Sequence, residues 1–170
     1  MSLLTADQLI VLARLARSAP PGAFVEVGVY RGGSAAVLHD VAVSQGRRLF
    51  LYDTFRGIPH ADPDKGDSHK VGDFADGLTR DQARVVFPYA VVLDGVFPDD
   101  FAPPEDVAFA HLDCDQYRSV KDSLAALWPV MVPGGLILLD DYCLAGCERA
   151  AHEVGRPFEV LPDGRALFRV

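Results

Sequence analysis

Short apolar runs alternate along the chain with segments whose apolar residues recur at helical spacing. The apolar runs predict five β-strands, at residues 24–27, 48–52, 90–93, 107–112 and 136–139. Helical spacing predicts α-helices over residues 6–19, 34–43, 79–87, 117–130 and 145–154. We expect the sequence P-G-G at 133–135 to separate the fourth of these helices from the next strand. Two further short runs, 158–160 and 166–168, flank the turn sequence P-D-G-R and predict a closing β-hairpin.

This order of elements predicts an α/β fold. Strands that are apolar almost throughout are typical of a parallel sheet whose two faces are both covered by helices. We therefore expect a Rossmann-like, mostly parallel sheet with helices on both faces and a C-terminal antiparallel hairpin at its edge. Five βα units followed by a hairpin is the element order of class I methyltransferases, although other doubly wound folds have similar orders.

Length and composition narrow the class of protein. A chain of 170 residues fits one domain, residues 1–170, and its 49% of hydrophobic residues exclude intrinsic disorder. With 16 basic and 24 acidic residues the net charge is −8, which argues against binding to nucleic acid or to an anionic membrane. No apolar run approaches the roughly 20 residues of a membrane span, and the first residues lack the basic start of a signal peptide. The three cysteines include no CxxC pair, so we expect neither a disulfide framework nor structural zinc, and a reducing cytoplasm as the setting.

The end of the first strand leads into a glycine-rich turn, F-V-E-V-G-V-Y-R-G-G-S. A dinucleotide fingerprint would need glycine at positions 28, 30 and 33, but position 30 is Tyr30. The methyltransferase pattern E/D-x-G-x-G-x-G is met by Glu26, Gly28 and Gly32. The carboxylate of Glu26 suits a cationic amino group better than a pyrophosphate, and the glycines are expected to let a ligand approach the backbone. An ordinary tight βα turn is the alternative interpretation.

Asp53 ends the second predicted strand. A carboxylate at this position can accept hydrogen bonds from both hydroxyls of a ribose, as in many doubly wound nucleotide-binding folds. Capping of the following turn is the alternative role.

The 25 residues that follow, 54–78, contain five aspartates and little periodicity. A segment of this length without regular structure is usually functional or mobile. We interpret it as a lid that excludes water from the site, and we expect it to be mobile without ligand and more ordered with it.

Four aspartates follow two of the predicted strands. Asp113 and Asp115 come after the fourth strand, and Asp140 and Asp141 after the fifth. If these strands are neighbours, about 4.8 Å apart, their ends bring the carboxylates together, and such crowding requires a cation or protons. Oxygen ligands without His or Cys favour Mg²⁺ or another hard divalent ion over zinc. Capping of the neighbouring helices is the alternative.

Nearby basic residues do not neutralise this group in the sequence. No lysine lies within five residues of Asp113, Asp140 or Asp141, and the nearest arginines along the chain are Arg118 and Arg149. A divalent ion is therefore the simplest compensation. By contrast, His111 lies within an apolar strand, so we interpret it as a buried, hydrogen-bonded histidine rather than a base.

Several motifs in order resemble those of a known family. They are L-Y-D-T-F-R-G-I-P, G-D-F-A-D, G-V-F-P-D, H-L-D-C-D-Q-Y-R-S, V-P-G-G-L-I-L-L-D-D-Y and C-E-R-A. Over about residues 22–155 the chain resembles the macrocin O-methyltransferase (TylF-like) family. The resemblance implies an enzyme of class I fold that uses S-adenosylmethionine and Mg²⁺ to methylate a sugar hydroxyl.

The resemblance also implies roles for individual residues. It implies that Asp113, Asp140 and Asp141 bind the metal. Apart from the resemblance, our candidate for the acceptor of the substrate hydroxyl's proton is Asp113 or Asp115, and loss of that proton to water is the alternative. It implies a set of residues around S-adenosylmethionine, with Gly95 and Phe97 near the adenine. The expected cofactor-binding set is Glu26, Gly28, Tyr30, Gly32, Ser34, Asp53, Thr54, Gly95, Phe97 and Asp113.

Two other functions are weighed against this one. An NAD-type oxidoreductase is disfavoured by Tyr30 in the glycine turn and by the lack of a Tyr-x-x-x-Lys pair. A catalytically inactive cofactor-binding subunit is disfavoured by the intact acidic group. We expect the partner to be a small molecule that offers a hydroxyl, and the sequence leaves a homo-oligomer open.

Overall fold

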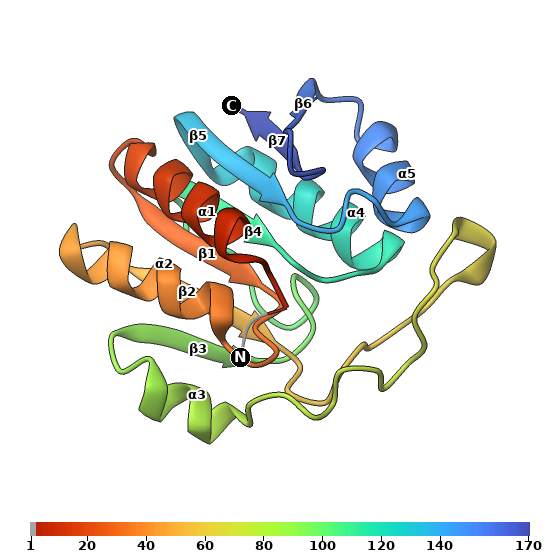
Figure 1. Cartoon of the computed structure of the whole chain (residues 1–170), viewed down its shortest axis with the longest axis horizontal. Coiled ribbons are helices and arrows are strands. Elements are labelled where there is room, and N and C mark those ends of the chain that lie inside the picture. Colours follow the sequence, from red (N-terminus) through yellow and green to blue (C-terminus); the bar gives the residue numbers. More distant parts are fainter. Residues whose placement is uncertain (1–2) are drawn as a thin grey trace.

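One seven-stranded sheet organises the computed structural model, which describes residues 3–170 (Figure 1). The strand order is β3-β2-β1-β4-β5-β7-β6. Neighbours among the first five strands are parallel, whereas β7 is antiparallel to β5, and β6 to β7. The predicted mostly parallel sheet with a C-terminal antiparallel hairpin is therefore confirmed. The strands are β1 (Ala23–Val27), β2 (Leu49–Asp53), β3 (Ala90–Asp94), β4 (Val107–Leu112), β5 (Met131–Leu139), β6 (Phe158–Val160) and β7 (Ala166–Arg169).

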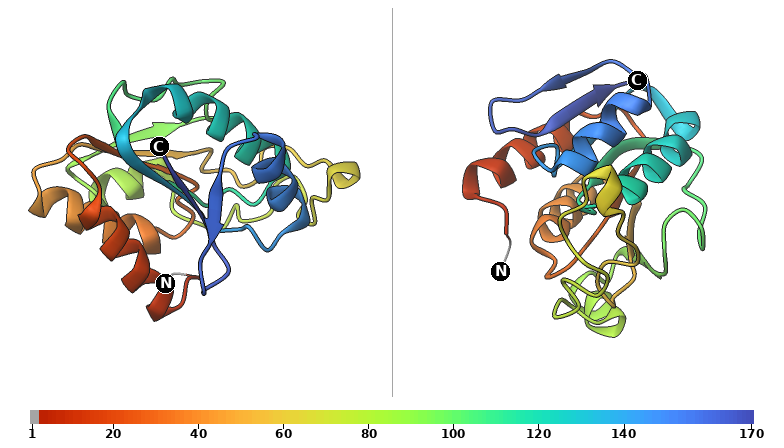
Figure 2. Two further views of the ribbon diagram at one scale, coloured as in Figure 1. Left: turned by 90° about the horizontal axis from the view of Figure 1, so that it is seen from above. Right: turned by 90° about the vertical axis from the view of Figure 1, so that its right-hand side faces the viewer.

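Helices cover both faces of the sheet, as Figures 1 and 2 show. Helices α1, α2 and α3 pack on one face, and α4 and α5 on the other. Successive side chains of a strand point to opposite faces, so Phe24 of β1 packs with the first layer, and Val25 and Val27 with the second. Burial on both faces explains why the strands are apolar almost throughout. The helices are α1 (Ala6–Ser18), α2 (Gly33–Ser44), α3 (Arg80–Val86), α4 (Tyr117–Leu127) and α5 (Ala145–Glu153), with short 3₁₀ turns η1 (Pro63–Lys65) and η2 (Trp128–Val130).

Helix starts follow the sequence signals unevenly. Thr5 and Thr79 each accept a hydrogen bond from the backbone N–H three residues later and form capping boxes at α1 and α3. Helix α2 begins after Gly32 without a side-chain cap and without an acidic residue in its first turn. Its first N–H groups are thus left for other partners, because the first turn of a helix has no intrahelical acceptors.

The sequence-based boundary of the fifth strand is wrong. We expected P-G-G at 133–135 to separate a helix from a strand beginning at residue 136, but β5 already begins at Met131. Met131 pairs with Val107, and the register with β4 shifts before the next pairs form. Gly134, with φ of +80°, and its neighbours lie in this irregular part of the strand, where an interrupted ladder tolerates proline and glycine.

The order of the strands around β1 indicates which edge of the sheet binds ligands. The chain leaves β1 toward β2 on one side, whereas β4 lies on the other side of β1. In open α/β sheets this reversal opens a crevice at the carboxyl ends of the strands, where ligands bind. Within residues 3–170, the helices are all too short or too polar to cross a membrane.

Candidate functional site

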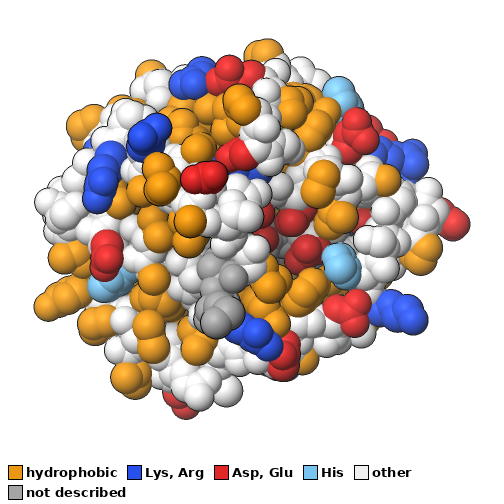
Figure 3. Space-filling model, viewed as in Figure 1, with side chains coloured by type: hydrophobic (Ala, Val, Ile, Leu, Met, Phe, Trp, Pro, Cys, Tyr) orange, Lys and Arg blue, Asp and Glu red, His pale blue; other side chains and the backbone are white. Residues whose placement is uncertain are grey.

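A cavity of about 240 Å³ lies at the carboxyl edge of the sheet. It is lined by Gly28, Asp53, Asp113 and Asp140, which follow or end β1, β2, β4 and β5, and also by residues 3–4. The space-filling view shows acidic side chains at the bottom of a hollow on this face (Figure 3). The cavity therefore joins the glycine turn to the aspartates after β4 and β5.

Most of the residues predicted to bind the cofactor line this cavity. Glu26 and Gly32 are the two that do not. Phe97, expected near an adenine, is 5% exposed and packs its ring 4.6 Å from that of Tyr52. Thr54 donates its hydroxyl to the carbonyl of Gly57 at 2.6 Å. The residues of the predicted set that line the cavity are Gly28, Tyr30, Ser34, Asp53, Thr54, Gly95, Phe97 and Asp113.

The glycines of the β1 turn make room for protein atoms. Gly28 has φ of +93°, and a Cβ there would lie 1.7 Å from the carbonyl oxygen of Asp113. Gly32 has φ of +77°, and its Cβ would lie 2.8 Å from the ring of Phe87. The predicted role of these glycines in admitting a ligand stays a prediction, while an added Cβ at either position would meet protein atoms. Glycine is required because the backbone of Asp113, just after β4, approaches Gly28, and the ring of Phe87, just after α3, approaches Gly32.

Asp53 organises the same turn. One carboxylate oxygen accepts hydrogen bonds from the backbone N–H groups of Val29 at 2.7 Å and Tyr30 at 3.0 Å. The other accepts from the N–H of Phe55 at 2.6 Å. The alternative turn-capping role is thus present, and it holds the end of β2 against the turn after β1. Contact of Asp53 with a ribose stays a prediction.

Glu26 lies beneath the cavity. It is fully buried, and its Oε1 lies 3.0 Å from Nδ1 of His111. Its Oε2 has no hydrogen-bond partner among residues 3–170. A direct contact between this carboxylate and a cofactor stays a prediction.

His111 joins Glu26 to the aspartates. The ring is fully buried, and its Nε2 lies 3.5 Å from Oδ1 of Asp140, which confirms a buried, hydrogen-bonded histidine. Burial alone would lower the pKa of His111, but hydrogen bonds to Asp140 and Glu26 outweigh it and raise the pKa to about 10. The two ring nitrogens of His111 thus link the carboxylate of Glu26 to that of Asp140.

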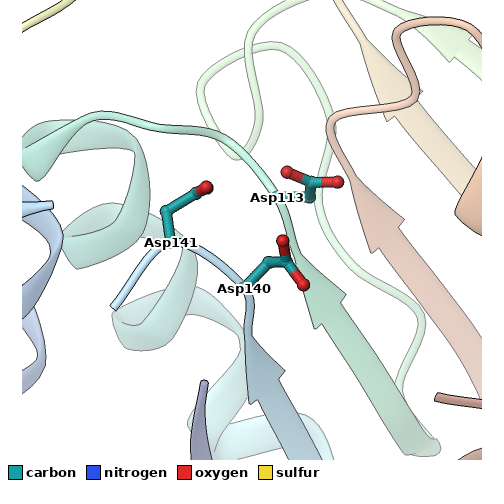
Figure 4. Close-up of side chains that lie close together, drawn as sticks. All are labelled: Asp113, Asp140 and Asp141. Carbon is teal, nitrogen blue, oxygen red and sulfur yellow. The ribbon is translucent and has the colours of Figure 1, made fainter. Parts of the chain in front are cut away.

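Three aspartates converge beside this network (Figure 4). Asp113, Asp140 and Asp141 are half-buried, and each offers an oxygen within 4.8 Å of the other two. Burial, and then the charge of Asp141, raise the pKa of Asp113 well above its usual value. Burial, with Asp115 and Asp140, raises the pKa of Asp141 to about 8. Without a cation, full ionisation of this group is unfavourable.

The helix-cap alternative for these aspartates is contradicted. Helix α5 has Leu144 as its N-cap and no side-chain cap bond, and α4 is likewise uncapped by its own N-cap residue, Gln116. Instead, Asp141 accepts a hydrogen bond from the backbone N–H of Asp115 at 3.1 Å. The aspartates face the cavity and each other rather than the helix starts.

A residue that the sequence did not single out lies against this group. Arg165 is fully buried, with Nη1 3.4 Å from Oδ1 of Asp140. Arg118 and Arg149, the nearest basic residues in sequence, instead pair with acidic residues elsewhere at exposed positions. The sequence correctly indicated that these two arginines do not neutralise the cluster, but it gave no sign of Arg165, which comes from the turn between β6 and β7 and carried only a turn signal.

The segment 54–78 is docked at its middle by a buried carboxylate. Asp67 is 9% exposed, and its Oδ1 accepts from the first N–H of α4, that of Tyr117, at 2.7 Å. Its Oδ2 accepts from the N–H of Asp62 at 2.8 Å. Asp67 therefore caps α4 from a distant segment, a role that no local signal in the sequence revealed.

The far end of this segment is bound to the glycine turn. The hydroxyl of Tyr30 donates to Asp76 at 3.0 Å, and Arg31 pairs with the same carboxylate at 2.5 Å. The ring of Phe74 packs edge-on against that of Tyr30, with 5.3 Å between the ring centroids, and lines the cavity. The segment thus forms one wall of the cavity, and its predicted mobility without ligand stays a prediction.

Comparisons with known proteins agree on one family. A family model described as Macrocin-O-methyltransferase (TylF) matches residues 7–160. The chain is 35% identical to the 8-demethyl-8-(2,3-dimethoxy-alpha-L-rhamnosyl)-tetracenomycin-C 4'-O-methyltransferase of Streptomyces olivaceus, over 78% of this chain and 58% of the relative. It is 29% identical to the mycinamicin III 3''-O-methyltransferase of Micromonospora griseorubida, over 81% of this chain and 61% of the relative. The chain therefore spans about three fifths of the length of these curated relatives.

A solved structure matches the fold. The O-methyltransferase NovP superposes with a TM-score of 0.77 at 22% identity, covering 99% of this chain and 81% of NovP. This likeness confirms the predicted class I methyltransferase fold.

Proposed function

The chain belongs to the macrocin O-methyltransferase (TylF) family, and from this premise we propose that it transfers a methyl group from S-adenosylmethionine to a sugar hydroxyl of a glycosylated natural product, with the help of Mg²⁺. The observation that carries the proposal is the single cavity lined both by the predicted cofactor residues and by the three clustered aspartates. The sugar acceptor is supported by the names of the two relatives, both methyltransferases of glycosylated natural products.

The groups that line the cavity suit the parts of S-adenosylmethionine. The first two residues of α2, Gly33 and Ser34, line the cavity, and this helix start has no side-chain cap. Its N–H groups suit the carboxylate of the methionyl part of S-adenosylmethionine. Asp53 lies at the end of β2, where ribose hydroxyls are bound in related folds. The ring of Phe97 offers an apolar surface for the adenine.

The three aspartates fit a hard divalent ion. Their oxygens lie close enough to share one ion, and the raised pKa values of Asp113 and Asp141 show how unfavourable the charged group is alone. We propose that Asp113, Asp140 and Asp141 hold Mg²⁺. When bound there, the ion would stabilise the oxyanion that develops on the acceptor hydroxyl.

The remaining residues of the site would orient the acceptor and take its proton. Asp115 lines the cavity beside the cluster and is the proposed proton acceptor, since Asp113 would be engaged as a ligand. The wall formed by residues 54–78 would exclude water and hold the hydroxyl in line with the methyl group, so that much of the acceleration comes from positioning.

A titration and an assay test the proposal together. S-adenosylhomocysteine binding is measured by calorimetry with and without Mg²⁺, and methyl transfer to mycinamicin III and to dimethoxyrhamnosyl tetracenomycin C by mass spectrometry. We expect transfer that EDTA abolishes and Mg²⁺ restores. Asp140→Asn should lose transfer and keep S-adenosylhomocysteine affinity, while Asp81→Asn, at an exposed position paired with Arg80, should change neither.

The outcomes separate the competing functions. Full transfer in EDTA would remove the metal from the mechanism and leave a protein side chain as the base. Binding of S-adenosylhomocysteine without transfer to any sugar hydroxyl would favour an inactive cofactor-binding subunit. The family match leaves the NAD-type oxidoreductase without support.

A further inference from the structure

Arg165 is among the largest fully buried side chains of the described residues, and its guanidinium is held on several sides. Asp163, two residues earlier in the β6–β7 turn, accepts from Nε at 3.1 Å and from Nη2 at 2.6 Å. The carbonyl of Gln8 in α1 accepts from Nη2 at 2.9 Å. A buried arginine needs such partners, and its planar fork is thereby fixed in one orientation.

The remaining arm of this fork reaches a carboxylate that lines the cavity. Nη1 of Arg165 lies 3.4 Å from Oδ1 of Asp140, the same oxygen that faces Nε2 of His111 at 3.5 Å. A buried guanidinium nitrogen and a buried imidazole nitrogen therefore both face one oxygen of this carboxylate. Among residues 3–170, both hydrogen bonds to the Asp140 side chain end on Oδ1, which leaves Oδ2 for the group formed with Asp113 and Asp141.

A carboxylate on a strand end can otherwise rotate about its side-chain torsions. Groups that bind the second oxygen of a metal-ligating carboxylate orient it, and their loss typically weakens metal binding 10- to 100-fold. Arg165 can orient the Asp140 carboxylate in this way, because its other donors are held by Asp163 and by the carbonyl of Gln8 in α1. Charge repulsion alone predicts the opposite result, namely that removal of Arg165 strengthens metal binding, since a nearby cation repels a metal ion.

We propose that Arg165 is a positioning residue: by binding Oδ1 of Asp140 it directs Oδ2 toward Asp113 and Asp141 and so shapes the divalent-ion site from the C-terminal hairpin. The inference rests on the proposed function, because it assumes that these three aspartates bind the ion. It gives the β6–β7 turn a role in the reaction, although that turn lies outside the cavity lining.

Mn²⁺ binding measured by electron paramagnetic resonance tests the proposal without turnover. Arg165→Met should weaken Mn²⁺ binding about 10- to 100-fold, and Arg165→Lys, which keeps the charge but loses the fork, should fall between it and the wild type. S-adenosylhomocysteine affinity should be unchanged in both. Arg169→Met is the matched control, because Arg169 lies on β7 at an exposed position and pairs only with Glu159; it should bind Mn²⁺ like the wild type.

Further measurements separate positioning from a general loss of structure. Combined with Asp140→Asn, Arg165→Lys should add little further loss of Mn²⁺ affinity, since both act on one ligand. A metal-free crystal structure of Arg165→Lys should show the Asp140 carboxylate rotated. If Arg165→Met does not fold, Arg165→Lys and Asp163→Asn decide the question.

Each outcome has a definite reading. Equal or tighter Mn²⁺ binding by folded Arg165→Lys and Asp163→Asn would overturn the inference and leave the proposed function standing. A wild-type protein that binds no Mn²⁺ would overturn both the metal site and this inference. Weakened Mn²⁺ binding together with equally weakened S-adenosylhomocysteine binding would mean a structural role only, and would also overturn it.

Discussion

Replacing Gly28 by alanine tests how closely β1 and β4 approach at the site. The added Cβ would lie 1.7 Å from the carbonyl oxygen of Asp113, half of an ordinary contact distance of 3.4 Å. The Cβ position is fixed by the backbone of residue 28, and the atom it meets is a backbone oxygen, so no flexible side chain can move aside. The end of β1, the end of β4 or both must shift.

Two separate terms set the size of the effect. The φ of +93° at position 28 is unfavourable for alanine by about 1–3 kcal/mol. Forcing the backbones apart in a packed region adds about 1–3 kcal/mol or more. We therefore expect Gly28→Ala to lower the free energy of unfolding by about 2–6 kcal/mol, a large part of the total for a domain of this size.

Gly46→Ala isolates the first term. Gly46 also has a positive φ, +64°, but a Cβ there would meet nothing within 4 Å. We expect this variant to lose only about 1–2 kcal/mol. The free energy of unfolding is measured for both variants in urea by circular dichroism, with the slope compared to confirm that the transitions are alike.

The difference between the two variants is therefore the measured quantity. If Gly28→Ala folds, the displaced backbone of Asp113 should also weaken Mn²⁺ binding, whereas Gly46→Ala should not. Equal stability of Gly28→Ala and Gly46→Ala would refute the close approach of the two strands, and with it this placement of Asp113 beside the glycine turn.

Three further predictions concern the cofactor and the segment 54–78. Asp53→Ala should weaken S-adenosylhomocysteine binding by about ten- to hundredfold, because the ribose contacts are lost. It should also lower the stability of the fold, because three backbone N–H groups lose their acceptor. Unchanged affinity in calorimetry, with the fold intact, would rule out the ribose contact. Limited proteolysis within residues 54–78 should be slower with S-adenosylhomocysteine than without, and equal rates would contradict a lid. Asp67→Ala should speed proteolysis of this segment without ligand, because α4 and the segment lose a buried carboxylate that hydrogen-bonds to both. Asp64→Ala, at an exposed position of the same segment, should not change the rate. Identical proteolysis of the two variants would show that Asp67 does not dock the segment.

Local patterns in the sequence were sufficient to predict a mostly parallel sheet and to place the aspartates at its carboxyl edge. Apolar runs report burial on both faces, and a parallel sheet puts all its strand ends on one edge, so Asp113 and Asp140 were predicted to meet once β4 and β5 were neighbours. The capping boxes at Thr5 and Thr79 also follow from residues only three positions apart.

Partners far apart in the sequence were decided only by the tertiary structure. Arg165 reaches Asp140 and the carbonyl of Gln8, and Asp67 caps α4 fifty residues later. Nothing in the neighbouring residues of Arg165 or Asp67 distinguishes them from ordinary turn and loop residues. Their roles arise when the hairpin and the segment 54–78 pack against the sheet.

The same limit applies to residues that the motif did identify. The pattern found Gly28, but only the approach of β4 shows that glycine is needed there to admit the carbonyl of Asp113. It found Glu26, but only the pairing of β1 with β4 brings His111 to its carboxylate. Sequence periodicity records which face of an element is buried, whereas the atom that each buried group meets depends on strand order and register, which the packing of the whole chain determines.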